Sequence, residues 1–399
     1  MSDDLWRQRI IYLPMFFLSL GCIGAKGEVV GTSFVIFLIS LYFGKADSVN
    51  KNDFKNNIIK ISVTVMACLL VTVWASALFH NNHGDVKEGL HYLERMIPFF
   101  LVLLYGYKGQ KILLPAWSGA LVGILYIDIV TLYQVLQNCN VRPTGVSNDP
   151  NILGAMLLFS IPLIFFGSRK FPYANSKIRI IGSAVSIITI VALFFSGSRG
   201  AIGGLIAANL FYVVFSTFVT REMSMKQGLI WLGTCLLVAS VGFEFLTRSI
   251  LRSYDGERLL LWQSGLNMFK DYPVFGTGIT NFKDYYIGKN YISPAAKELN
   301  LLTLHNIYVQ VLATTGIVGF LGFASVFVYQ IKVLYHYLRE TMGNNKWVFW
   351  SMASAIVGIL VHGIVDTIFL NRNIMMDFWM LWGIVAYLIV KNNCDEGDI

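Results

Sequence analysis

Three side chains in the second half of the chain have the chemistry to act on a phosphate-linked substrate at a membrane surface. Arg199 stands in a short turn, Ser196-Gly197-Ser198-Arg199-Gly200, and Arg258 opens a helical pattern. A guanidinium grips phosphate oxygens through two parallel hydrogen bonds, so each arginine is a candidate ligand for a phosphate group at headgroup depth. His305 begins the next apolar segment, and a neutral imidazole can accept a proton. These residue types predict oxyanion binding and proton transfer at the bilayer surface.

Each of the three residues also has a purely structural interpretation. Arg199 can be a snorkelling membrane anchor, Arg258 can pair with Asp255 or Glu257, and His305 can be a hydrogen-bonded packing residue. Arginines near His305 are expected to favour its neutral, basic form. Both interpretations therefore stay open at the level of single residues.

Further polar groups lie at the predicted outward ends of apolar spans. Arg142 precedes Asn148-Asp149-Pro150-Asn151, which suits either a capped helix start or an anion site at the helix N-terminus. His362 and Asp366 are four residues apart and share one helical face, either to orient a substrate hydroxyl or as a structural pair. Asp128 lies inside a span and requires a partner, for which Arg142 or Arg95 is expected.

The elements that must position these residues are membrane helices. Hydrophobic residues make up 55% of the 399 residues and charged residues 14%, which is too apolar for a soluble domain. The sequence predicts an all-α polytopic protein with about twelve spans of the length that crosses a bilayer. They are expected near 10–25, 29–44, 58–79, 92–107, 112–137, 150–167, 178–197, 200–219, 228–246, 316–338, 347–369 and 374–390.

The charge pattern predicts an orientation. Lysines and arginines concentrate in alternate short loops, which places both termini in the cytoplasm and the polar segment Thr247–Thr303 outside. The formal charge of +8 is spread over these loops and forms no single stripe, so it is explained by topology better than by nucleic-acid binding. We expect three parts: residues 1–246 with nine helices, an outer loop domain at 247–303, and residues 304–399 with three more helices.

The outer loop is expected to be partly helical. Leu259, Trp262, Leu266 and Phe269 recur at helical spacing after Arg258, which predicts an amphipathic helix on the membrane surface that ends before Pro273. The five cysteines stand singly and imply neither a disulfide framework nor a zinc site. His80, His83, Asp85 and His91 cluster in another outer loop, but their spacing fits no standard zinc pattern, and no metal or cofactor is expected.

The order and spacing of these residues resemble a known family. The turn at Arg199, the series Glu257-Arg258, Trp262, Gly265, Met268-Phe269, Tyr272-Pro273, Gly276 and Gly278, then His305-Asn306, Tyr308, Gln310 and Gly316, and finally His362-Gly363 and Asp366, is similar to the O-antigen ligase and polymerase superfamily. The similarity runs from about Arg142 to the C-terminus. The motifs are specific for the superfamily and weak within it.

The resemblance implies a GT-C-like, metal-independent glycosyltransferase of the bacterial inner membrane with its active site facing the periplasm. Its donor would be a glycan on undecaprenyl diphosphate and its acceptor lipid A–core, with inversion at the sugar carbon. Arg199 and Arg258 would hold the diphosphate and His305 would act on the acceptor hydroxyl. Arg142, Arg95, His362, Asp366 and Asn306 complete the expected substrate-binding set.

Three alternatives remain beside the ligase, which the near-continuous fit from Arg258 through His305 favours. A polymerase would extend the lipid-linked glycan, and a protein O-oligosaccharyltransferase would glycosylate a protein. A small-solute transporter would show inverted repeats and charges near the midplane, and the sequence has neither.

Overall fold

The protein is a bundle of membrane helices in the computed structural model. The structure describes residues 10–43, 60, 74, 77, 79, 83–170, 175–233, 255–288, 291, 303–340 and 345–396. Within these ranges every regular element is a helix, so the predicted all-α fold is confirmed. Most of the predicted spans 58–79 and 228–246, and much of the polar segment 247–303, lie outside the described residues.

Six described helices are long and apolar enough to cross a membrane. They are α7 (Leu113–Gln137), α8 (Pro150–Lys170), α9 (Ser176–Ser196), α10 (Arg199–Phe218), α13 (Ile307–Glu340) and α15 (Arg372–Glu396). Shorter apolar helices accompany them: α2 (Leu13–Ile23), α3 (Gly27–Phe43) and α14 (Lys346–His362). The predicted polytopic membrane architecture is therefore confirmed.

Two predicted spans differ from the structure. The span expected at 92–107 is divided at Met96 between α5 (His83–Arg95) and α6 (Ile97–Tyr107), because Pro98 falls in the first turn of a new helix. The span expected at 347–369 ends as a helix at His362, and the chain continues through a loop and the 3₁₀ turn η2 (Ile368–Leu370). This early end puts Asp366 in a loop instead of on the helical face that we expected it to share with His362.

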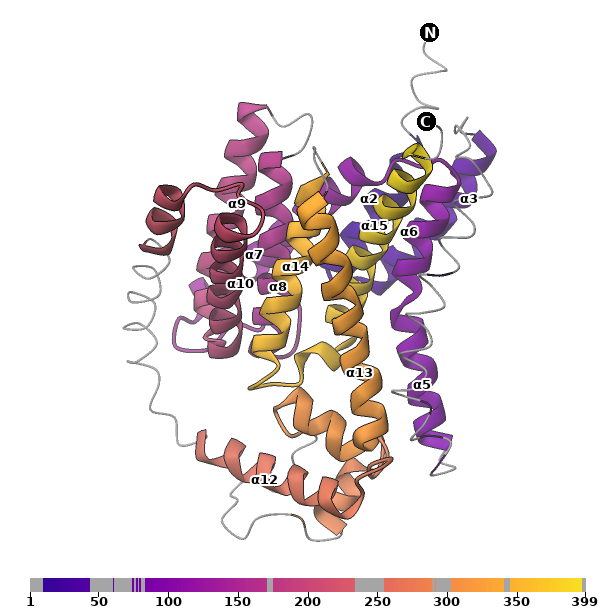
Figure 1. The fold of residues 1–399 in the computed structure, drawn as a ribbon, viewed down its shortest axis with the longest axis vertical. Coiled ribbons are helices and arrows are strands. Elements are labelled where there is room, and N and C mark those ends of the chain that lie inside the picture. Colours follow the sequence, from indigo (N-terminus) through magenta and orange to yellow (C-terminus); the bar gives the residue numbers. More distant parts are fainter. Residues whose placement is uncertain are drawn as a thin grey trace.

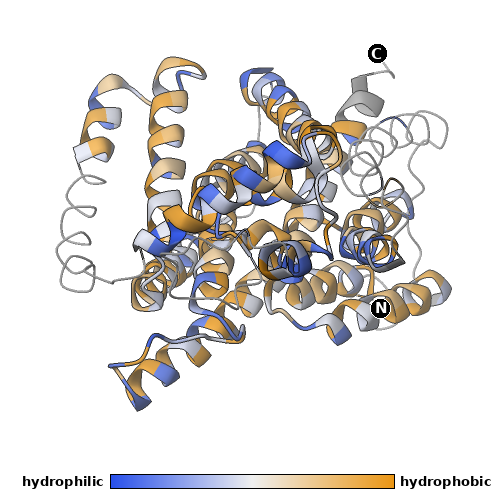
Figure 2. Ribbon diagram, turned by 90° about the horizontal axis from the view of Figure 1, so that it is seen from below, coloured by the Kyte–Doolittle hydropathy of each residue, from blue (hydrophilic) through white to orange (hydrophobic). Residues whose placement is uncertain are grey.

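The bundle has central and peripheral helices (Figure 1). In α8 and α15, 83% and 89% of the membrane-length window is buried, against 33% in α9. Large apolar side chains such as Ile129 and Ile180 are exposed on α7 and α9. Figure 2 shows apolar residues on outward as well as inward faces of the helices. Such outward apolar surface is expected where lipid tails surround the protein.

Small residues let α10 approach α14 closely. A β-carbon on Gly204 would lie 2.6 Å from the carbonyl oxygen of Gly358, and one on Gly200 would lie 2.3 Å from Cδ2 of His362. Membrane helices that lack a hydrophobic driving force between them associate through such close backbone contact. The contact fixes the first turn of α10, which carries Arg199, against the last turn of α14.

Helix α12 (Asp255–Asp271) lies across one end of the bundle (Figure 1). It ends before Pro273 as the sequence predicts and begins three residues before Arg258. Leu261 and Met268 pack with Leu304 and Ala313 in a small core separate from that of the bundle, whereas Leu259 and Leu266 are exposed. The helix therefore has one face on α13 and a second apolar face left for another surface.

A kink in α13 receives the loop that follows α12. Gly316 has φ 66° and ψ −165°, which interrupts the helix inside its 307–340 range. The loop supplies the missing partners, because Ile317 N donates to Pro273 O at 2.8 Å and Gly278 N donates to Thr314 O at 2.9 Å. Buried backbone groups in a membrane protein must be paired, so the loop and the kink depend on each other. The span expected at 316–338 begins at this kink.

Candidate functional site

The candidate site lies at the end of the bundle that α12 crosses, and Asp366 is its centre. Asp366 Oδ1 lies 3.2 Å from His305 Nδ1 and accepts a hydrogen bond from its neighbour Thr367 N at 2.8 Å. Its Oδ2 accepts a hydrogen bond from Asn151 Nδ2 at 2.9 Å. Both carboxylate oxygens are thus engaged by groups from separate segments.

The surroundings of Asp366 keep it ionised. Burial by itself raises the pKa of a carboxyl, but the hydrogen bond and charge of His305, the charge of His362 and the Thr367 N–H outweigh burial and hold the pKa of Asp366 below its ordinary value. A carboxylate facing Nδ1 orients the imidazole with its Nδ1–H directed at the carboxylate, which leaves Nε2 as the ring nitrogen turned away from Asp366.

The backbone presents His305 in an unusual conformation. Its φ is 47°, in the left-handed region that non-glycine residues seldom adopt. The flanking chain is fixed on both sides: Leu304 N donates to Gln310 Oε1 at 2.8 Å, and Ile307 N donates to Gly363 O at 2.9 Å. The His305 side chain remains 29% exposed while that of Asp366 is 10% exposed, so the imidazole is accessible and its partner sheltered.

His305 has a partner that the sequence analysis did not assign to it. The Asp366 carboxylate contacts its ring, whereas the expected influence of neighbouring arginines stays a prediction. Asp366 itself was expected to orient a substrate hydroxyl or to pair with His362. The early end of α14 at His362 removes the shared helical face and turns Asp366 toward His305.

His362 lies between the start of α10 and Asp366. It is buried at the end of α14, where Ser198 Oγ, in the residue before Arg199, lies 3.5 Å from its Nε2. The charges of Asp366 and Arg258 act on the imidazole of His362 in opposite directions. The first turn of α10 thus packs against His362, and Arg258 lies within electrostatic range of it.

Arg142 reaches the same centre through Asn151. Its NH2 group donates to Asn151 Oδ1 at 2.9 Å, and its Nε donates to Ser196 O at 2.7 Å. Asn151 in turn donates to Asp366, so a continuous chain of hydrogen bonds joins Arg142 to His305. Asn151 is a site residue that we did not predict individually, although it belongs to the motif Asn148-Asp149-Pro150-Asn151.

That motif is a helix cap. Asp149 Oδ1 accepts hydrogen bonds from Asn151 N at 2.6 Å and Ile152 N at 3.3 Å. The first N–H groups of α8 are therefore bound by the chain's own carboxylate, as in an ordinary N-terminal cap. The capping interpretation of the motif is the one that the structure supports, and an anion at this helix end is not needed to satisfy these donors.

Two further candidates have structural contacts. Arg95 NH2 donates to Glu88 Oε1 at 2.9 Å and NH1 donates to Leu370 O at 3.2 Å, which ties α5 to η2. Asn306 Oδ1 accepts from Tyr308 N and Val309 N and caps α13.

Asp128 accepts a hydrogen bond from Thr189 Oγ1 on α9 at 2.7 Å, where we expected Arg142 or Arg95.

The predicted histidine-rich loop has a different organisation. His80 and the side chain of His83 lie outside the described residues. Asp85 accepts hydrogen bonds from the backbone N–H and the hydroxyl of Thr280, which joins α5 to the loop after α12. Within the described part of the chain, no group of three or more metal-binding side chains comes together.

The fold and this site define a helical membrane protein with permanent cations and a carboxylate-bound histidine at one end. Comparison with known proteins agrees with that class. Residues 184–324 match the family described as O-Antigen ligase (Wzy_C), and this range includes Arg199, Arg258 and His305. The predicted resemblance to the O-antigen ligase superfamily is thereby confirmed.

Two relatives extend the similarity beyond that region. The chain is 24% identical over 344 residues to the teichuronic acid biosynthesis protein TuaE of Bacillus subtilis (strain 168), covering 77% of this chain and 67% of that protein. It is also 24% identical over 288 residues to an uncharacterized protein of Haemophilus influenzae, covering 65% of this chain and 69% of that protein.

Proposed function

We propose that the protein is a metal-independent glycosyltransferase that moves a glycan from undecaprenyl diphosphate to a hydroxyl acceptor, as an O-antigen ligase acting on lipid A–core. The contact of His305 with Asp366 is the observation that carries the proposal. This contact provides a general base at the end of the bundle that α12, the helix of Arg258, crosses. The match of residues 184–324 to the O-antigen ligase family supports the same class of reaction.

The proposed reaction is one displacement. The acceptor oxygen attacks the anomeric carbon from the face opposite the diphosphate, a new C–O bond forms, and the bond from carbon to diphosphate oxygen breaks with inversion. His305 Nε2 takes the acceptor proton, and Asp366 stabilises the resulting imidazolium. The lipid diphosphate leaves with the bonding electron pair, and His305 later releases its proton to water.

The arginines would stabilise the leaving group. Negative charge grows on the diphosphate as the bond breaks. Fixed cations therefore stabilise the transition state more than they stabilise the bound substrates before reaction. Arg258 would contact the diphosphate from α12 and Arg199 from the start of α10. No paired carboxylates of the glycosidase type are needed, because the donor already carries a good leaving group.

Arg142 and Asn151 would position the base. Asn151 holds Asp366 Oδ2 while Arg142 holds Asn151, so both oxygens of Asp366 keep their direction as His305 gains charge. Asn151→Ala should lower turnover more than it lowers donor affinity, since it leaves Arg199 and Arg258 in place. Equal losses of turnover and donor affinity in Asn151→Ala would contradict a positioning role.

We further propose a GT-C-like enzyme of the cytoplasmic membrane whose outer loop domain at 247–303 and candidate site both face the periplasm. The distribution of lysine and arginine supports this orientation. Lys283 is an exposed residue of the loop after α12 and provides a test. In a cysteine-free background, Lys283→Cys should react with an impermeant thiol reagent in intact spheroplasts, whereas reaction only after lysis would reverse the topology.

A polymerase is the second candidate function, and one observation favours it. The relative TuaE is named for teichuronic acid biosynthesis and not for lipopolysaccharide assembly. Purified protein should be incubated with lipid-linked glycan, with lipid A–core in one tube and without it in another. Transfer that requires lipid A–core supports the ligase, lengthening of the lipid-linked glycan alone supports the polymerase, and no glycan transfer in either tube contradicts both.

A further inference from the structure

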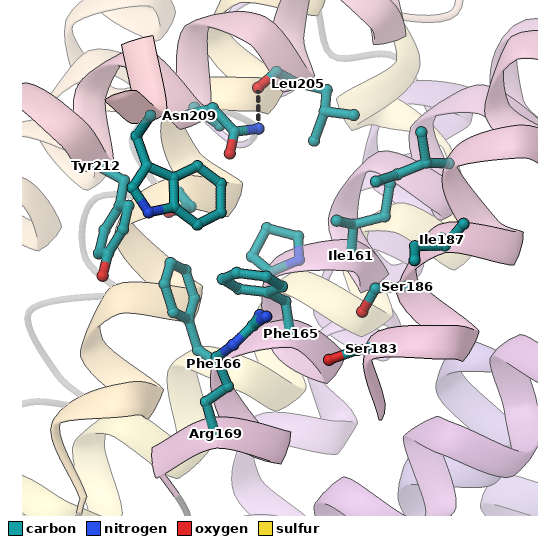
Figure 3. Close-up of a pocket in the computed structure, with 15 residues that line it drawn as sticks. Ile161, Phe165, Phe166, Arg169, Ser183, Ser186, Ile187, Leu205, Asn209 and Tyr212 are labelled. Carbon is teal, nitrogen blue, oxygen red and sulfur yellow. Dashed lines mark hydrogen bonds between the residues drawn. The ribbon is translucent and has the colours of Figure 1, made fainter. Parts of the chain in front are cut away.

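A cavity of about 220 Å³ lies between α8, α9, α10 and α14 (Figure 3). Its walls include Phe165 and Phe166 from α8, Ile187 from α9, and Leu205 and Tyr212 from α10. It is larger than the apolar cavities of about 150 Å³ that stay dry and bind benzene in other proteins.

The cavity follows from the way α9 and α10 diverge. A tight turn at Gly197 joins the two helices near the candidate site, and its φ of 61° permits the sharp reversal. Away from that turn α9 packs along α8 while α10 packs along α14. The space between α9 and α10 therefore opens in the half of the bundle that lies farther from His305.

The chemistry of the walls favours a hydrocarbon occupant over water. Aromatic and aliphatic side chains dominate, and the Asn209 amide donates to Leu205 O on its own helix at 2.8 Å (Figure 3). Ser354 Oγ is buried with no hydrogen-bond partner among the described residues. A buried water needs two to four polar partners, and these walls supply few.

One cation lines the cavity, and two more precede its wall on α9. Arg169, at the last turn of α8, places its guanidinium carbon 3.8 Å from the centre of the Phe165 ring. Figure 3 shows this guanidinium directed toward Phe165 at the edge of the cavity. Lys177 and Arg179 are exposed in the first turn of the adjoining helix α9. Glu222, an acidic residue at the same end, is paired with Lys346 at 2.7 Å.

The position of Arg169 along α8 fits a lipid in the leaflet opposite the candidate site. Arg169 lies 18 residues along α8 from Asn151 of the candidate site, which at about 1.5 Å per residue is about 27 Å, close to the roughly 30 Å of a bilayer core. Arg169 therefore lies near the opposite membrane surface. A phosphate at that surface would meet Arg169, and a chain hanging from it would enter the cavity.

We propose that this cavity binds one acyl chain of an anionic phospholipid whose headgroup phosphate is held by Arg169, with Lys177 and Arg179 alongside. The acyl chain fills the space in which α9 and α10 do not contact each other. Basic pockets between membrane helices recognise anionic headgroups in this way. The inference does not depend on the glycan reaction or on which acceptor is used.

Lipid retention measured by native mass spectrometry tests the proposal on the full-length protein. Delipidated protein is offered phosphatidylglycerol and phosphatidylcholine with identical acyl chains. We expect the wild type to retain one phosphatidylglycerol with several-fold preference over phosphatidylcholine. Arg169→Gln should abolish the preference, and Ser183→Phe, which places a ring in the cavity wall, should reduce retention of both lipids.

Arg339→Gln is the matched control. Arg339 also stacks on an aromatic ring, that of Tyr335 at 5.5 Å, but it does not line the cavity. Its variant should retain phosphatidylglycerol like the wild type. Equal retention of the two lipids by the wild type overturns the proposal, as does retention unchanged by Ser183→Phe.

A fluorescence measurement on the wild type covers the case in which Ser183→Phe does not fold. Trp231 lines the cavity. Phosphatidylglycerol with brominated acyl chains should quench the part of the emission that Trp231→Phe removes. Failure to quench that part places the acyl chain elsewhere and contradicts the proposal.

Discussion

The two ends of the bundle are built on different principles. At the candidate site, single polar atoms from several segments meet one to one, as in the hydrogen bonds from Asn151 and Thr367 to Asp366. At the other end, a cavity of about 220 Å³ has apolar walls, and its cations lie at the edge. The first end depends on the direction of individual bonds, and the second depends on volume and net charge.

The two ends of the bundle should therefore respond differently to substitution. Hydrogen-bonded networks lose most when one member is removed, because the remaining buried polar group then lacks a partner. Apolar surfaces lose free energy roughly in proportion to the area exposed. Substitutions of one functional group should therefore have large effects on transfer at the candidate site and graded effects elsewhere.

The largest effect is expected for His305. His305→Ala should slow glycan transfer by about 10²–10⁴-fold with donor binding largely retained, because a general base contributes roughly that factor. Wild-type activity should fall toward acid as the imidazole takes up a proton, and this limb of the pH profile should vanish in the variant. If His305→Gln keeps near-normal turnover and an unchanged profile, His305 is not the base.

Next in size should be the two arginines. A charge-assisted hydrogen bond contributes roughly 1.5–3 kcal/mol, which corresponds to about 10- to 150-fold in rate. Arg258→Ala and Arg199→Ala should each reduce kcat/KM for the lipid-linked donor within that range, with normal amounts of protein in the membrane. Wild-type activity in both variants would contradict the proposal that Arg199 and Arg258 bind the diphosphate.

Asp366→Asn should reduce turnover by about tenfold or more, since it replaces a charge-assisted contact to His305 by a neutral one. The pKa of Asp366 is lowered in the folded protein, so the contact stabilises the fold above the ordinary aspartate pKa and is lost as pH falls through the lower folded value. The wild type should thus be more stable than the variant at mildly acidic pH, and this advantage should shrink at strongly acidic pH. Unfolding curves at mildly and strongly acidic pH test this, and identical acid sensitivity of the two proteins would contradict it.

The smallest effect is expected on stability at the contact of α10 with α14. Gly200→Ala puts a β-carbon 2.3 Å from His362, and such overpacking typically destabilises by about 1–3 kcal/mol. Gly203→Ala is its control, because a β-carbon there meets nothing within 4 Å. Thermal denaturation in detergent should show a lower Tm for Gly200→Ala alone. Equal Tm values would mean that close packing does not fix this end of the bundle.

Sequence reasoning predicts the helical class well because it depends on local patterns, and the chemistry of the site stays a prediction. Long apolar runs specify spans, and the positions of Arg199, Arg258 and His305 follow from motifs. The end of α12 at Asp271 agrees with the helix predicted to stop before Pro273.

The partners of these residues are a different matter, because they are set by contacts between distant segments. The contact of His305 with Asp366 spans 61 residues and that of Asn151 with Asp366 spans 215. Helical spacing suggested that Asp366 would share a face with His362, and the end of α14 at His362 removed that face. No local pattern announces such an end, since Gly363-Ile364-Val365 is still apolar.

The chain of contacts from Arg142 to His305 has a consequence for biosynthesis. Its carboxylate, Asp366, is supplied by the loop that precedes the last helix, α15. During synthesis from the N-terminus the proposed diphosphate ligands Arg199 and Arg258 leave the ribosome long before that loop does. Under the proposed mechanism, a nascent or prematurely ended chain would have its donor-binding arginines without an oriented base, so transfer would be withheld until insertion is nearly finished.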